Sequence, residues 1–289
     1  MDYLKKINRC IEFIELNLKN ELILQTIAQQ SGLSLYHCHR IFSGLTGYSL
    51  KEYIRKRRLS NAAVELINSK KRIIDLAYDY GYETPESFSR AFKQLFSVNP
   101  SIYRKRIPYI KLVDKIDIYE NKSILIKGGK MIKPEIIEKP AFHILGYAVE
   151  TNYLNGDNFK DIPQFWKEAM SEGLLQKISK KLKPECCLGV CLDFQEDGKM
   201  KYIIGYEVEA LDQVPPGQFQ TIIPSAKYAV FTAKGKMPES IQNTVKYIYQ
   251  QWFPNSQYER ADKPELELYD ENRLTDPENS EVDIYIPLM

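Results

Sequence analysis

The sequence predicts a two-domain chain, in which an all-α domain with two helix-turn-helix units precedes an α+β domain of two β-α-β-β repeats. Three observations support this fold class. One helical unit occurs twice in the first 107 residues, the apolar period changes from helix-like to strand-like beyond residue 131, and 289 residues are enough for two cores. We expect a helical domain at 1–107, a linker at 108–130 and the α+β domain at 131–289.

Charge is distributed unevenly between these halves. Residues 1–110 carry 18 Lys and Arg against 10 Asp and Glu, a net charge of +8, whereas residues 131–289 carry 17 against 25, a net charge of −8. A basic half indicates a polyanion partner, and an acidic half indicates a separate task. No apolar run reaches the ~18 residues of a membrane helix, and the N-terminus lacks an apolar signal core, so we expect a cytoplasmic protein with no membrane partner.

The first helix-turn-helix unit follows an amphipathic helix with one apolar face, formed by Leu4, Ile7, Ile11, Ile14 and Leu18. In "LQTIAQQSGLSLYHCHRIF", Ala28 lies four residues before Gly32, and Ser34 is placed to cap a second helix. A small residue lets two helices approach closely, and glycine permits a tight turn between them. This spacing is typical of a helix-turn-helix.

The same spacing recurs 49 residues later. In "IIDLAYDYGYETPESFSRAF", Ala77 lies four residues before Gly81, and Thr84 followed by Pro85 is a helix start signal. In the helix that follows, Phe88, Ala91, Phe92 and Leu95 form a buried stripe. The repetition favours DNA binding over the alternative of a plain helical bundle with a solvated basic face.

One long helix, "SLKEYIRKRRLSNAAVELI", connects the two units, with Leu50, Tyr53, Ile54, Ala62, Ala63, Leu66 and Ile67 on its buried side. Such a rigid helix suits two recognition helices set one DNA turn apart, ~34 Å, in successive major grooves. Basic clusters close both units, "YIRKRR" at 53–58 and "YRKR" at 103–106. We assign Lys56 to a phosphate contact; for Arg57 and Arg58 phosphate contact and solvated charge both remain open.

These residues resemble the DNA-binding domain of the AraC/XylS transcriptional regulators. The resemblance covers nearly all of residues 1–107 and is clearest in "IIDLAYDYGYETPESFSRAFKQLFSVNPSIYRKR", residues 73–106. It implies that the exposed faces of both recognition helices contact double-stranded promoter DNA. The positions that match are Tyr36, His39 and Arg40 in the first helix, and Glu86, Ser87 and Arg90 in the second.

The side chains at these positions suit the role. Arginine can bind guanine in bidentate fashion, Glu86 can accept from cytosine N4, and Ser87 suits a phosphate. Structural ion pairs for Arg40 and Arg90 are the alternative, as is an ordinary surface position for His39. Pro85 stands where the family often has a polar residue, which removes one contact and predicts less stringent readout by the second helix.

The acidic half has a different internal repeat. "EIIEKPAFHILGYAVETN" is extended, "DIPQFWKEAMSEGLLQKI" is a helix opened by Ile162 and Pro163, and "CCLGVCLDF" and "MKYIIGYEVEA" are strands. The order recurs in "QFQTIIPSAKYAVFTAKG", "PESIQNTVKYIYQQWF", "PELELYD" and "EVDIYIPL". The segment 106–131, which contains Gly128 and Gly129, is expected to be a linker with short strands at most.

Residues 131–289 resemble the GyrI-like effector-binding domain, most clearly in "YAVFTAKG", "PELELYD" and "VDIYIP". The resemblance implies an aromatic cleft with an acidic residue, which matches Glu267. Strand alternation places Glu265, Glu267 and Tyr269 on one face. An acidic group among aromatic rings selects cationic or hydrogen-bond-donating ligands. The candidate walls are Trp166, Tyr147, Tyr206, Phe231 and Tyr269, for which an ordinary core position is the alternative.

Together these features predict a one-component bacterial transcriptional regulator. Its partners would be promoter DNA, a small effector for which a lipophilic cation is one candidate, and RNA polymerase if it activates; monomer and homodimer both remain open. We expect no cofactor, no metal and no catalysis, since the five cysteines do not form paired C-x-x-C motifs and no phosphate loop or catalytic triad occurs. Two alternatives remain: a GyrI-like hydrolase in which Glu267 and a nearby tyrosine activate water, and a purely architectural DNA binder.

Overall fold

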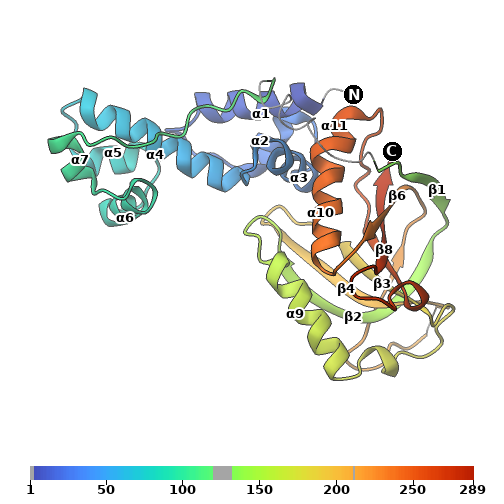
Figure 1. The fold of residues 1–289 in the computed structure, drawn as a ribbon. Coiled ribbons are helices and arrows are strands. Elements are labelled where there is room, and N and C mark those ends of the chain that lie inside the picture. The colour runs from blue at the N-terminus through green and yellow to red at the C-terminus, as the bar shows by residue number, and fades with distance from the viewer. Residues whose placement is uncertain (1–2, 120–131, 211) are drawn as a thin grey trace. The chain divides into compact units, whose positions relative to one another are not determined.

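The computed structural model describes residues 3–119, 132–210 and 212–289 (Figure 1). The chain forms two compact units, which divide between residues 124 and 125. We call them the helical unit and the sheet unit. No helix in the described part of the chain is both long enough and apolar enough to cross a membrane.

The helical unit contains seven helices over residues 3–106, as the repeated sequence pattern predicts. They are α1 (Tyr3–Leu16), α2 (Leu24–Ser31), α3 (Leu35–Thr46), α4 (Leu50–Asn68), α5 (Ile73–Asp79), α6 (Pro85–Phe96) and α7 (Pro100–Arg106). α2 and α3 form the first helix-turn-helix, and α5 and α6 form the second. α4 is the predicted long connection between them.

Local sequence signals explain where the recognition helices α3 and α6 begin. Gly32 and Gly81 adopt the left-handed conformation at the turns, with φ of 65° and 74°, which favours glycine. The Ser34 side chain accepts from the backbone N–H of the third residue on and caps α3, and Thr84 does the same for α6. Pro85 is the first residue of α6, where its missing N–H costs nothing.

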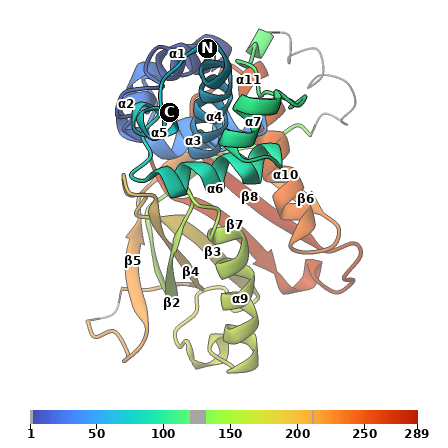
Figure 2. The same ribbon diagram turned by 90° about the vertical axis from the view of Figure 1, so that its left-hand side faces the viewer.

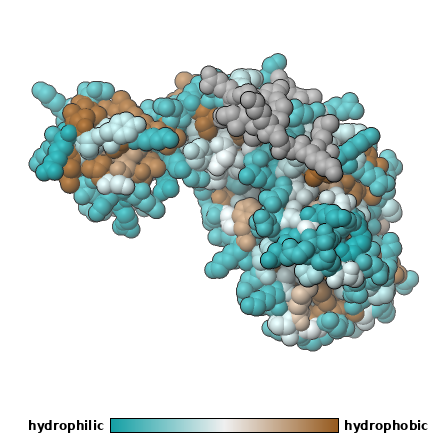
Figure 3. Space-filling view, viewed as in Figure 1, coloured by the Kyte–Doolittle hydropathy of each residue, from teal (hydrophilic) through white to brown (hydrophobic). Residues whose placement is uncertain are grey.

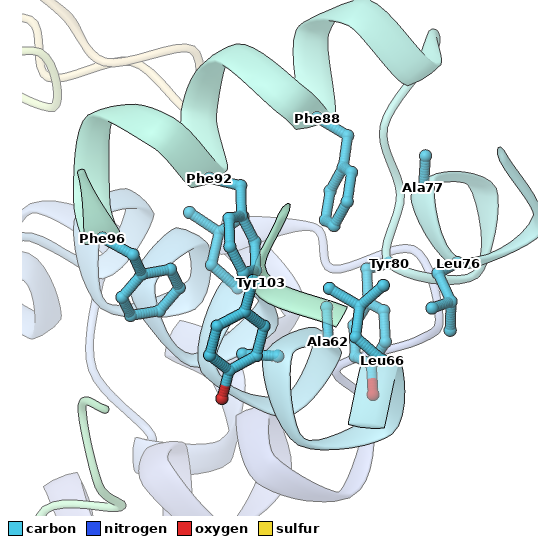
Figure 4. Close-up of a cluster of buried hydrophobic side chains, with 11 residues drawn as sticks. Ala62, Leu66, Leu76, Ala77, Tyr80, Phe88, Phe92, Phe96 and Tyr103 are labelled. Atoms are coloured by element: carbon cyan, nitrogen blue, oxygen red, sulfur yellow. The ribbon is translucent and has the colours of Figure 1, made fainter. Parts of the chain in front are cut away.

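The second helix-turn-helix has its own apolar core, built mainly from α4, α5, α6 and α7 (Figure 4). Phe88, Phe92 and Phe96 project from one side of α6 onto Leu66 and Tyr103. The predicted stripe of α6 is therefore confirmed in its aromatic members. The prediction for Ile67 is wrong: its side chain is 38 % exposed, because it lies beyond the buried face of α4. Figure 3 shows apolar surface gathered at the end of this unit formed by α5 and α7.

Two arginines of the basic clusters cap helix ends inside the helical unit. Arg58 donates to the carbonyl oxygens of Leu18 at 2.9 Å and Asn20 at 2.7 Å, just beyond the C-terminus of α1. Arg104 donates in the same way to Leu66 at 2.9 Å, near the C-terminus of α4, and to Lys71. The last carbonyls of a helix lack intrahelical partners, and a guanidinium offers several donors in one plane. A fully solvated charge is therefore wrong for Arg58, and its phosphate contact stays a prediction.

The predicted linker is partly a structured strap. Its described part, residues 108–119, contains no strand and runs along the helical unit instead of leaving it. Its contacts join Ile110 and Leu112 to the second core, Val113 to Ser60 on α4, and Lys115 to Glu12 on α1. The guanidinium of Arg57 binds Glu15 at 2.8 Å and also donates to the Val113 carbonyl, so Arg57 is structural as well. The strap thus touches α1, α4 and the core of the second helix-turn-helix. The rest of the linker, with the predicted Gly-Gly, lies outside the described residues.

The described residues of the sheet unit form one antiparallel sheet of eight strands in the order β1-β6-β8-β7-β3-β4-β2-β5. Figure 2 shows this sheet with β2 to β8 labelled. The strands are β1 (Glu135–Lys139), β2 (Phe142–Asn152), β3 (Cys186–Leu192), β4 (Lys199–Val208), β5 (Phe219–Ile223), β6 (Ala226–Lys234), β7 (Glu265–Asp270) and β8 (Glu281–Leu288). The predicted order of an extended segment, a helix and two strands is found in both repeats, but each extended segment forms two strands, β1 and β2 in the first repeat and β5 and β6 in the second. The two repeats meet where β3 pairs with β7, and each lends its first short strand to the other, since β1 pairs with β6 and β5 pairs with β2.

Both helical segments of the repeats pack on the same sheet face. The first is α9 (Asn158–Ser171), followed by the short 3-10 helix η1 (Leu175–Lys177). The second combines α10 (Glu239–Tyr247), the π-helical turn η2 (Ile248–Trp252) and α11 (Phe253–Asn255). α9 lies over β2, and α10 lies over β6 and β8.

The predicted start of α9 is wrong by four residues. Pro163 lies inside the helix, because a turn at Gly156 and Asp157 already supplies the first helical hydrogen bonds. The opposite face of the sheet is filled by its own apolar cluster, with Ile144, Val190 and Tyr228 fully buried.

Candidate DNA-contacting helices and effector site

The N-terminal half of α6 presents the predicted second contact set. Glu86 and Arg90 are exposed and Ser87 is half-buried. The Ser87 hydroxyl donates to the Thr84 carbonyl at 2.7 Å and its backbone N–H donates to Thr84 Oγ1 at 3.1 Å, so this serine belongs to the helix cap. Its oxygen remains an acceptor. The capped N-terminus of α6 therefore presents the Ser87 hydroxyl oxygen, as an acceptor, and the Arg90 guanidinium on one solvent-facing surface.

The predicted contacts of α3 lie in a different environment. Tyr36 and His39 are buried, and Arg40 is half-buried with its guanidinium 5.7 Å from the centre of the Tyr36 ring. Burial, together with the charges of Arg40 and Lys51, lowers the pKa of His39 to about 4, so its imidazole is neutral at pH 7. The surface position that the sequence left open for His39 is therefore wrong in this form of the chain.

Lys56 has partners within the helical unit. Its ammonium pairs with Glu52, one helical turn earlier, at 2.8 Å, and lies 4.4 Å from the centre of the Tyr48 ring. Ion pairs between residues one helical turn apart contribute only ~0.3–0.5 kcal/mol, so this pair leaves the lysine able to exchange its carboxylate for a phosphate. The phosphate contact stays a prediction.

One cross-strand row organises the helix-covered face of the sheet unit. Strand register connects β6, β8, β7, β3, β4 and β2 through Phe231, Ile284, Glu267, Gly189, Ile204 and Tyr147 in that order. Paired residues in adjacent strands project to the same face. The row therefore carries an acidic residue and a glycine at its centre, with a predicted aromatic residue at each end.

The Glu267 carboxylate is held by two tyrosine hydroxyls. Tyr202 donates to Glu267 Oε2 at 2.7 Å, and Tyr269 donates to the same oxygen at 2.8 Å. Trp166 of α9 donates from Nε1 to the Tyr202 hydroxyl at 3.0 Å, and its ring centre lies 4.6 Å from that of Tyr269. Burial and the negative charge of Glu267 raise the pKa of both tyrosines well above the ordinary value. Both hydroxyls therefore stay protonated and act as donors.

Gly189 creates the space in which this cluster forms. A Cβ atom at this position would lie 2.2 Å from the Tyr202 hydroxyl and 2.9 Å from Glu267 Oε2. No side chain larger than hydrogen fits without displacing both groups. Sequence reasoning missed Gly189 and Tyr202. Strand alternation along β4 carried a signal for Tyr202, because it shares a face with the predicted Tyr206.

The predicted pocket residues divide into two sets. Glu267, Tyr269 and Trp166 come together as described. Tyr147 and Tyr206 belong to the same apolar cluster as Tyr202, Trp166 and Tyr269. Within it, Tyr147 is half-buried near Gln218, and Tyr206 is buried beside Cys187 with the Lys181 ammonium 4.0 Å from its ring centre. Phe231 lies apart, fully buried edge-on to Trp252 in the second repeat. A separate cavity of about 100 Å³ lies on the other sheet face, lined among others by Lys139, Cys186, Leu188 and Tyr285. It is remote from the Glu267 cluster because the sheet lies between them.

Comparison with known proteins assigns the two parts of the chain to two different families. Residues 27–106 match the model of a helix-turn-helix domain family, and residues 135–288, more than half of the chain, match that of the integron-associated effector binding proteins. The regulatory protein SoxS of Salmonella typhimurium is 39% identical over 107 residues, which are 37% of this chain and 100% of SoxS. The transcriptional activator AarP of Providencia stuartii is 41% identical over 98 residues, 34% of this chain and 73% of AarP.

A solved structure, that of SAV2435 bound to tetraphenylphosphonium, is 20% identical, covers 55% of this chain and 94% of its own, and has a TM-score of 0.48. The matched domains define a helix-turn-helix transcriptional regulator with a fused effector-binding domain. The chain belongs to the AraC-type regulators and carries an effector-binding domain of the integron-associated, GyrI-like family.

Proposed function

We propose that this regulator responds to a small lipophilic cation bound beside Glu267. The observation that carries the proposal is the carboxylate fixed by the Tyr202 and Tyr269 hydroxyls, both of which contact Trp166. Hydrogen bonds donated to a carboxylate favour its charged form, and aromatic faces attract cations. The site thus combines a fixed negative charge with an apolar surround.

The cluster also makes the hydrolase alternative less favourable. A general base has to take a proton from water, whereas Glu267 Oε2 already accepts hydrogen bonds from the Tyr202 and Tyr269 hydroxyls. We therefore propose sensing without turnover. Incubation of the full chain with an activated ester, with product measured by absorbance, tests this point, and hydrolysis that Glu267→Gln abolishes would restore the alternative.

Calorimetry on the full chain tests the cation site. The probes are tetraphenylphosphonium and the neutral, similarly shaped triphenylphosphine oxide. Because loss of one member of a buried charge pair costs ~2–5 kcal/mol of binding, we expect Glu267→Gln to weaken the cation about 30-fold or more and the neutral probe little. Glu278→Gln, at an exposed position, is the matched control. Equal cation affinity in the wild type and in Glu267→Gln would exclude the site.

We further propose that Glu86 and Arg90 on α6, and Arg40 on α3, read bases, while Ser87 and Lys56 contact phosphate. Exposure of the first two on a capped helix supports this assignment. A duplex enriched from a random pool by the full chain serves as probe. Arg90→Ala should cost ~1–3 kcal/mol on this duplex and relax selection at one base pair, whereas Lys93→Ala on the same helix should weaken all duplexes alike. Unchanged selectivity in Arg90→Ala would make Arg90 a phosphate or structural residue.

Contact with RNA polymerase belongs to the proposal only if the regulator activates. A transcription assay with purified polymerase and the enriched duplex upstream of a promoter decides between activation and repression. Light scattering on the same protein, with and without the duplex, gives the molar mass and so distinguishes a monomer from a homodimer.

A further inference from the structure

Two thiols of the helical unit lie in contact where α1 packs against the first helix-turn-helix. Cys10 on α1 and Cys38 on α3 are fully buried, and their sulfur atoms are 3.7 Å apart. The Cys10 thiol donates to the Ile27 carbonyl at 3.2 Å. The Cys10 proton therefore lies in the bond to Ile27, and in the contact between the two sulfurs the Cys38 thiol donates to the Cys10 sulfur.

Packing alone does not require this pair. The second unit repeats the first with an offset of 49 to 50 residues, and there Leu59 on α4 and Phe88 on α6 stand at the corresponding positions and are fully buried in an apolar core. Leu59 and Phe88 show that large apolar side chains can fill these positions when only packing is required. The first unit instead places two oxidisable atoms at the contact between α1 and its recognition helix.

We propose that Cys10 and Cys38 form a reversible disulfide when the chain meets hydrogen peroxide or another low-molecular-weight peroxide, and that this bond weakens specific DNA binding. The inference about DNA rests on the proposed role of α3 as a base-reading helix. The inference that the disulfide forms does not depend on that role.

The reaction balances with the peroxide as sole oxidant. The Cys10 thiolate attacks one peroxide oxygen, the O–O bond breaks, and the leaving hydroxide takes up a proton as water. Cys38 then attacks the sulfur of the resulting sulfenic acid, the S–O bond breaks, and a second water leaves with the Cys38 proton. The hydrogen bond from Cys38 holds the pKa of Cys10 below its ordinary value, while the same hydrogen bond and burial raise the pKa of Cys38, which makes Cys10 the attacking group. Burial makes the reaction slow, because the oxidant enters only when α1 opens locally.

The bond would displace the recognition helix. The sulfurs must approach from 3.7 Å to a bond length of ~2.05 Å, so the two cysteine side chains and the helices that carry them must together close about 1.7 Å. Recognition groups have to be held within ~0.5 Å of their productive positions. If α3 takes up only about a third of this closure, its base contacts are lost, while phosphate contacts made through flexible lysines tolerate the shift.

The experiment treats the full chain with hydrogen peroxide, then removes the oxidant. Peptide mapping without reduction should find a Cys10–Cys38 cross-link, and anisotropy should show about a tenfold or larger loss of affinity for the duplex enriched by the reduced protein. Dithiothreitol should restore affinity in the same sample. This control uses the wild-type chain, so it does not depend on whether a variant folds. A chain with Cys186, Cys187 and Cys191 replaced by alanine should keep the response, and Cys38→Ala should lose it.

Each alternative result is decisive. Absence of the cross-link under excess peroxide would overturn the proposal. A cross-link with unchanged affinity would overturn the switch, and Arg40→Ala would then show whether α3 reads bases at all. Loss of affinity that persists in Cys38→Ala would place the oxidation elsewhere.

Discussion

The two helix-turn-helix units share one turn but differ in what lies behind it. Both turns use a glycine with positive φ, yet no atom approaches within 4 Å of a Cβ built on Gly32, whereas a Cβ on Gly81 would lie 2.6 Å from Nη1 of Arg58. Arg58 also binds the carbonyls after α1, so the second turn rests on a residue that closes the first unit. The two copies of the motif therefore differ in their packing. The turn at Gly81 is in contact with Arg58, which also binds the carbonyls that follow α1, whereas the turn at Gly32 has no such contact among the described residues.

The largest expected effect comes from comparing alanine at the two glycines. Gly32→Ala should cost ~1–2 kcal/mol in the free energy of unfolding, the strain of a left-handed residue. Gly81→Ala should cost about 3–4 kcal/mol, because it adds the displacement of Arg58 and its hydrogen bonds. Urea denaturation of both variants checks this. Equal losses would mean that Arg58 swings away freely and that the units are not coupled through the turn.

A buried histidine should make the first unit the more acid-sensitive of the two. The folded-state pKa of His39 is about 4, below the ~6.5 of an unfolded chain, so protons bind the unfolded state first as pH falls. His39 should favour folding fully above pH 6.5 and lose about 2 kcal/mol of that contribution between pH 7 and pH 5. The residue fifty positions later is Ser89, which does not titrate.

The measurement is the urea midpoint of the full chain across this pH range. His39→Gln should flatten the decline, while Ser89→Ala, the matched position in the second unit, should leave it unchanged. A wild type whose stability is constant from pH 7 to pH 5 would show that the imidazole is solvated in solution.

The smallest effect is expected at the helix caps. Ser34 accepts from the His37 N–H at 3.4 Å, and Thr84 from the Ser87 N–H at 3.1 Å. Since removal of an N-cap costs ~0.5–2 kcal/mol and the longer bond is weaker, Thr84→Ala should cost ~1 kcal/mol and Ser34→Ala ~0.5 kcal/mol. Thermal unfolding monitored by circular dichroism resolves the order. The reverse order would show that hydrogen-bond length does not rank these caps.

Local rules of the chain carried most of the fold prediction. Helix starts followed from Ser34, Thr84 and Pro85, and both tight turns followed from the positive φ that glycine tolerates. Strand alternation placed Glu267 and Tyr269 on one face, as the structure shows them. The boundary of α9 was missed because a proline suggests a helix start wherever it stands, while here the preceding turn had already begun the helix.

The sequence by itself determined the elements, their order and the residue types available to each site, because helical and strand periods, caps and glycine turns depend on near neighbours. Only the tertiary structure decided the partners. An arginine that will cap the end of α1 looks in sequence like one that will bind phosphate, since the guanidinium suits either acceptor. Tyr202 meets Glu267 across 65 residues, and Cys10 meets Cys38 across 28, through strand register and helix packing that bring distant side chains together.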